Sequence, residues 1–114
     1  MNVVVVRGVL SRAPELREVP SGDRLGQFEV TVRASDRPTA SVPVAWFDPP
    51  DRALALEAGS EVVVTGAVRR RFFRTPAGTG SRTEVLATQV IPASQRKGAR
   101  TAIEAALDEV AAVT

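Results

Sequence analysis

The chain contains no cysteine and no histidine among its 114 residues. Without cysteine it can form neither a disulfide framework nor a thiolate metal site. Without histidine it lacks the commonest general base and the commonest metal ligand. Aromatic side chains are also few, with four phenylalanines, one tryptophan and no tyrosine. The first two absences remove the residues that most metal centres and proton-transfer sites use.

A long apolar segment is missing as well. The valine run at residues 3–6 is far too short to cross a bilayer, and no basic segment precedes it as in a secretory signal. We therefore expect a soluble cytoplasmic protein that does not act at a membrane. The length fits one domain and not two.

The acidic residues form no pattern typical of a catalytic site. Asp48 and Asp51 are better explained as charges at the start of a helix, and Asp108 and Glu109 as a solvated helix face. No nucleophile has a base partner, and no carboxylate cluster has the spacing of a nuclease metal site. We predict a protein that is not an enzyme and needs neither a cofactor nor a metal ion.

The basic residues, in contrast, are concentrated in one part of the chain. Residues 1–65 carry seven arginines against nine acids, and residues 66–100 carry eight basic residues against Glu84 alone. Three acids then follow in residues 101–114. Fourteen of the fifteen cations are arginine, whose planar group binds phosphates and stacks on flat groups better than lysine. The pattern favours a polyanionic partner.

Alternating apolar and polar residues predict an all-β domain. The five expected strands are residues 3–10, 27–33, 42–47, 61–74 and 83–91. Gly8 in the first strand indicates a bulge or a close backbone contact, and Phe28 is expected in the core. Residues 11–26 are predicted as a loop, and Gly78 with Gly80 as the tip of the last hairpin.

Two helices are expected. Asp48 can cap a short helix that begins at Pro49 and Pro50 and ends before Gly59. A five-stranded barrel with one short helix between its third and fourth strands is the layout of an OB-fold.

The second helix follows the barrel. Thr101 and Glu104 have the spacing of a capping box. The apolar residues that follow at helical spacing are Ile103, Ala106, Leu107 and Val110, and the large ones among them would form the apolar stripe of this helix. We therefore divide the chain into an OB-fold domain at residues 1–93 and, at residues 94–114, a basic connector with an amphipathic C-terminal helix.

The fourth strand is the most informative segment. One of its faces carries Arg69, Arg71 and Phe73, and the other carries Arg70, Phe72 and Arg74. Guanidinium groups beside an aromatic ring suit a groove that follows a nucleic-acid backbone and stacks its bases. The alternative is a solvated basic strand that protects a sheet edge. In either case we expect one of Phe72 and Phe73 to pack inward.

The single tryptophan, Trp46, allows two interpretations. It lies in the core if it follows the face of Val42 and Val44. It lies on a binding surface if Pro43 and Phe47 supply the buried face instead.

Taken together, these segments resemble the bacterial single-stranded DNA-binding protein family. The resemblance covers residues 2–92 and rests on several stretches in the family's order: Pro14-Glu15-Leu16-Arg17, Pro20-Ser21-Gly22, Phe28-Glu29-Val30-Thr31-Val32, Val44-Ala45-Trp46, Gly59-Ser60-Glu61-Val62-Val63-Val64-Thr65-Gly66, the run of Arg69 to Arg71, and Thr83-Glu84-Val85.

The resemblance implies an OB-fold subunit that binds single-stranded DNA, usually as a homotetramer of two dimers. The valines at residues 3–6 would pair with the same strand of a second copy. The implied stacking residues are Trp46 and Phe73, and the implied basic contacts are Arg17, Arg69 and Arg71, with Arg33, Arg74 and Arg82 as further candidates. DNA and RNA both stay open, because stacking and phosphate contacts serve both.

Two departures from the family are visible. The segment at residues 33–41 is short, and Ala40 stands where a stacking tryptophan is often found, which predicts weaker binding. The chain also lacks the family's flexible tail with an acidic tip, so it resembles a tail-less paralogue without that means of recruiting proteins.

We therefore expect sequence-independent binding and protection of single-stranded DNA at the nucleoid, in replication, repair or recombination. The alternative is an OB-fold assembly subunit, similar to a primosome protein, that acts through its C-terminal helix. The acidic residues of that helix are also expected to lie over the basic segment and compete with DNA.

Overall fold

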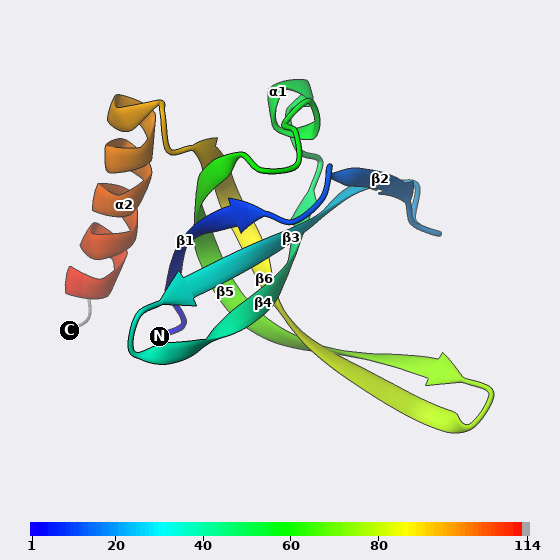
Figure 1. Ribbon diagram of the computed structural model, residues 1–114. Helices are drawn as coiled ribbons and strands as arrows, with labels where there is room; N and C mark the ends of the chain where they lie inside the picture. Colours follow the sequence, from blue (N-terminus) through cyan, green and yellow to red (C-terminus); the bar gives the residue numbers. More distant parts are fainter. Residues whose placement is uncertain (113–114) are drawn as a thin grey trace.

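Five strands form a closed ring because the first strand has two neighbours (Figure 1). The computed structural model describes residues 1–112. Its elements are β1 (Val4–Leu10), β2 (Glu15–Glu18), β3 (Arg24–Ala34), β4 (Arg37–Phe47), α1 (Asp51–Leu54), β5 (Glu61–Thr75), β6 (Gly78–Pro92) and α2 (Arg96–Ala111). The strand order is β1-β5-β6-β4-β3-β2, and β1 also pairs with β3. The prediction of a five-stranded barrel of the OB type with a C-terminal helix is confirmed.

The inside of the barrel is filled by the alternate apolar residues of its strands. Phe28 is 4% exposed and Val30 is fully buried, as the alternation along β3 predicts. They pack with residues of every other barrel strand and with Ala53 of α1. Side chains at the other positions of these strands point away from this core.

The closure of the barrel depends on Gly8. Near this residue β1 leaves β5 and turns to β3, where Val9 pairs with Thr31 and Leu10 with Val30. A β-carbon on Gly8 would lie 2.7 Å from Val30 Cγ1 and still closer to the Thr31 carbonyl oxygen. The close backbone contact expected at Gly8 is therefore present.

One strand was missed in the segment predicted as a loop. β2 pairs with the start of β3 through Glu15 to Glu18, and all four of its residues are exposed. A strand without a buried face has no apolar alternation, so its periodicity gives no signal.

The details of α1 also differ from the prediction. Asp48 does not cap it: the helix starts at Asp51, its N-cap is Pro50, and no side chain caps it. Asp48 has a φ of 50°, and its N–H donates to the Arg24 carbonyl oxygen. Gly59 lies in the following turn and does not end the helix.

The C-terminal helix begins earlier and packs through a different face than predicted. α2 starts at Arg96, and the Thr101 hydroxyl donates to the Lys97 carbonyl oxygen, so Thr101 is not a cap. The buried residues are Ala99, Ala102 and Ala106, whereas Leu107 is 59% exposed. Of the apolar residues predicted at helical spacing, Ala106 is buried, whereas the stripe of large side chains faces largely outward. Small alanines, which a search for large apolar residues overlooks, let the helix approach the sheet.

The β5–β6 hairpin extends well beyond the barrel (Figure 1). Its turn is formed by residues 76–77, so Gly78 follows the tip and Gly80 lies inside β6. Phe72 is 67% exposed and Phe73 is 39% exposed. The expectation that one of them packs inward is wrong, because at this distance from the barrel neither face of the hairpin meets the core.

No helix among residues 1–112 is long and apolar enough to cross a membrane.

We predict that Gly8→Ala lowers the free energy of unfolding by about 1–3 kcal/mol, because the new methyl group meets a backbone carbonyl and a core side chain. Urea unfolding at one fixed protein concentration measures the change. The matched control is Gly98→Ala in α2, whose β-carbon would lie 3.6 Å from its nearest neighbour. This control should gain about 0.5–1 kcal/mol from helix propensity. Wild-type stability in Gly8→Ala would contradict the packing argument.

Candidate nucleic-acid interface

The arginines of β5 meet specific partners on β6. Arg69 pairs in register with Glu84, Arg71 with Arg82, and Phe73 with Gly80. Cross-strand partners lie on the same side of a sheet, so these six residues share one side of the hairpin. Together with Phe47, which lies beside them, we call them the Phe73 face.

Glu84 is the centre of the Phe73 face. Its side chain is 5% exposed, and Arg69 donates from Nε and Nη2 to Glu84 Oε2 at 3.0 and 2.8 Å. Arg71 Nε lies 3.5 Å from Glu84 Oε1. One buried carboxylate therefore holds two guanidinium groups. Glu84 is not among the residues predicted to form the site, although it is the only acid in residues 66–100, which carry eight basic residues.

The two held guanidinium groups lie over aromatic rings. Arg69 Cζ is 5.5 Å from the centre of the Phe47 ring, and Arg71 Cζ is 5.5 Å from the centre of the Phe73 ring. Both distances are within the range of cation–π attraction. A β-carbon on Gly80 would lie 2.6 Å from Phe73 Cε2, so the glycine gives this ring its place across the hairpin. The Phe73 face thus presents two rings and two oriented guanidinium groups.

Phe47, and not Trp46, is the β4 ring that lies beside these arginines. Phe47 is 40% exposed. Trp46 is half-buried, packs against the core cluster, and its ring centre lies 6.4 Å from that of Phe28. From the sequence, Phe47 is a candidate for the buried face, and the structure instead places it on the exposed side. The available signal was the alternation along β4, which puts Trp46 on the side of Val42 and Val44 and Phe47 on the opposite side.

Of the other four arginines predicted to contact the nucleic acid, two lie on or near the Phe73 face and two do not. Arg17 on β2 pairs with Leu25, which pairs with Phe47, so Arg17 stands in the same cross-strand row as that ring. Arg82 is exposed on the Phe73 face. The remaining two are not brought to this face. Arg74 projects from the opposite side of the hairpin, and Arg33 lines a separate hollow with Arg7, Thr31 and Glu61.

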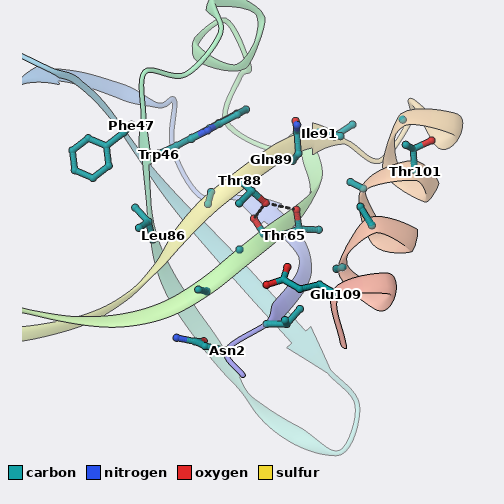
Figure 2. Close-up of a pocket in the computed structure, with 18 of the residues that line it drawn as sticks. Asn2, Trp46, Phe47, Thr65, Leu86, Thr88, Gln89, Ile91, Thr101 and Glu109 are labelled. Atoms are coloured by element: carbon teal, nitrogen blue, oxygen red, sulfur yellow. Dashed lines mark hydrogen bonds between the residues drawn. The ribbon is translucent and has the colours of Figure 1, made fainter. Parts of the chain in front are cut away.

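A groove of about 930 Å³ is lined by residues of α2, β5 and β6 (Figure 2). Trp46 and Phe47 are among its lining residues, and the Thr65 and Thr88 hydroxyl oxygens lie 3.0 Å apart on its floor. Glu109 of α2 also lines the groove. Among residues 1–112, no ion pair joins the acids of α2 to the hairpin arginines. That these acids compete with DNA for the basic segment stays a prediction. The same residues contain no group of three or more acidic side chains placed to hold a metal ion.

Comparison with models of known protein families finds a match. The family described as the single-strand binding protein family matches residues 1–93, which span the barrel and end just after β6. No curated protein matches the chain.

We predict that Glu84→Gln lowers the free energy of unfolding by about 1–3 kcal/mol, because it leaves two neighbouring guanidinium groups without their shared counter-charge. The loss stays below that of a fully buried pair, since the Arg69 and Arg71 side chains are 30% and 38% exposed. Urea unfolding measures it. The control, Glu104→Gln on the exposed side of α2, should stay within about 0.5 kcal/mol of wild type. Equal stability of both variants would show that Glu84 does not hold the face together.

Proposed function

This chain belongs to the single-strand binding protein family, and we propose that it binds single-stranded DNA along the Phe73 face. One observation carries the choice of face. Two exposed rings, Phe47 and Phe73, each lie beside a guanidinium group that the buried Glu84 carboxylate orients. Exposed rings stack bases of any sequence, and oriented guanidinium groups bind the phosphates between them.

The hydrogen bonds of Arg69 leave it able to bind phosphate. A guanidinium group has five N–H donors, of which Glu84 accepts one from Nε and one from Nη2. The other donors remain available for a phosphate oxygen. Arg82, which is exposed beside Arg71, and Arg17, in the row of Phe47, extend the positive surface in two directions. The face therefore combines stacking with neutralisation of phosphate charge and involves no catalytic step.

The wider role that we propose is the protection of single strands exposed during replication, repair or recombination, in the cytoplasm at the nucleoid. This role is supported by contacts that do not depend on base sequence: bases stack on phenylalanine whatever their identity, and arginine binds the backbone.

Trp46 remains a predicted contact at the edge of this surface. Its fluorescence should fall when oligo-dT binds, and unchanged emission with tight binding would assign Trp46 to the core alone.

We predict that Phe47→Ala and Phe73→Ala each weaken oligo-dT binding by about 1–3 kcal/mol, or roughly 5- to 150-fold in Kd.

We also predict that the slope of log K against log salt becomes shallower by about 0.7 in Arg71→Gln, because one phosphate contact is lost. Fluorescence anisotropy at several salt concentrations measures both effects.

The matched control for the ring variants is Leu107→Ala, which removes an exposed apolar side chain of α2 and should leave Kd unchanged. Duplex DNA and oligo-U serve as competitors to define the ligand. Wild-type affinity in both ring variants, or equal affinity for duplex and single strand, would contradict stacking on this face.

We further propose that the chain forms a homo-oligomer through β1, with a tetramer built from two such dimers. β1 pairs with β5 from Val4 to Val9, but with β3 only at Val9 and Leu10. Within the described chain, residues 4–7 therefore have a strand partner on one side only. An open edge that begins with three consecutive valines is suited to pairing with the same strand of a second copy.

We predict that Val5→Lys lowers the mass in solution from that of an oligomer to that of a monomer, because like charges would face each other across the paired strands. Light scattering on a sizing column measures the mass. Val5 is 45% exposed, and the control Val110→Lys replaces a side chain on α2 that is 46% exposed. This control should keep the oligomer. A monomeric wild type, or an unchanged mass in Val5→Lys, would contradict the proposed edge.

A further inference from the structure

The side of the hairpin opposite the Phe73 face carries its own set of exposed residues. Arg70, Phe72 and Arg74 share this side of β5, and Ser81 stands beside them on β6. We call these four residues the Phe72 face. They continue the interior side of the barrel, but burial ends at the cross-strand pair of Val85, which is 5% exposed, and Val68, which is 44% exposed. Beyond this point the hairpin projects away from the barrel (Figure 1).

Phe72 is the most exposed aromatic ring of the chain, at 67%. A single exposed phenylalanine is common on protein surfaces and needs no function. What distinguishes Phe72 is that Arg70 Cζ lies 5.7 Å from the centre of its ring. Arg70 is held there, because its Nε and Nη2 donate to the Ser81 hydroxyl oxygen at 3.2 and 2.9 Å. The Phe72 face therefore repeats the pairing of ring and anchored guanidinium found on the Phe73 face.

The two faces differ in what anchors the arginine. Arg69 and Arg71 share the carboxylate of Glu84, which cancels part of their charge. Arg70 is anchored by a neutral hydroxyl, and among residues 1–112 neither Arg70 nor Arg74 takes part in an ion pair. The Phe72 face thus has two uncompensated positive charges beside an open ring. This combination fits a segment with both phosphates and bases.

One segment of single strand cannot stack on both rings at the same place. Phe72 and Phe73 are adjacent in a strand and therefore point to opposite sides of a two-stranded ribbon. From this geometry we infer a second nucleic-acid site on the Phe72 face, which holds a second segment of single strand against the far side of the hairpin. The inference rests on the proposed function of the Phe73 face. The second segment comes either from another strand or from the same strand after it turns around the hairpin.

The test is the number of short oligonucleotides bound per chain. An oligo-dT of about eight nucleotides lies within the length that one OB-fold accommodates. Native mass spectrometry should find up to two of them per wild-type chain and only one per chain in Phe72→Ala. In Phe72→Ala, the Phe73 face should keep its wild-type Kd, whereas the Kd of the Phe72 face should rise by roughly 5- to 150-fold. Arg70→Gln should weaken the same site, and Val110→Ala, an equally accessible apolar change, should alter neither.

A long oligo-dT identifies the source of the second segment. If one strand supplies both segments, the length of strand occluded per chain falls in Phe72→Ala. If separate strands supply them, that length stays constant while the second short oligonucleotide is still lost. Thermal unfolding of each variant checks the fold, which removal of a mostly exposed side chain should leave intact.

Two results separate the second site from the function on which it rests. One oligonucleotide per wild-type chain, lost in Phe73→Ala and unaffected by Phe72→Ala and Arg70→Gln, would overturn the second site and leave the proposed function standing. Absence of oligo-dT binding in the wild type would overturn the proposed function itself.

Discussion

The Phe73 face depends on one buried carboxylate. Burying an unpaired charge costs several kcal/mol, so Glu84 can be 5% exposed only because Arg69 and Arg71 both contact it. The dependence is mutual, because two arginines on the same side of a strand repel each other without a counter-charge. With the carboxylate between them, each guanidinium group is directed to a neighbouring ring. The face is thereby organised before any ligand arrives.

The second constraint is the length of the β5–β6 ladder. Within the barrel, the inner side of this ladder carries core residues such as Val64 and Val90, which pack against residues of the other strands. Beyond Val68 the two strands continue as a pair with no layer on either side, so the alternation that separates inside from outside now separates two solvent-exposed sides. The same arginine-rich segment therefore supplies both hairpin faces, and the proposed functions of these faces follow from the ladder outgrowing the barrel.

Much of the barrel was predictable, because strands with one buried side carry a period of two that does not depend on the rest of the fold. The strand at Phe28 was recognised in this way. β2 was not, because all its residues are exposed, and the packing side of α2 was not, because it consists of alanines. Where the buried and exposed positions of an element do not differ in side-chain size or polarity, the local sequence does not predict which side is buried.

By itself the sequence determined which residues share a side of one strand: Arg69, Arg71 and Phe73 belong together in any extended conformation. Only the tertiary structure decided which residues from other strands join them. It brought in Glu84 from β6 and Phe47 from β4. The physical reason is that strand register and barrel closure are set by contacts between distant segments, which local periodicity does not encode.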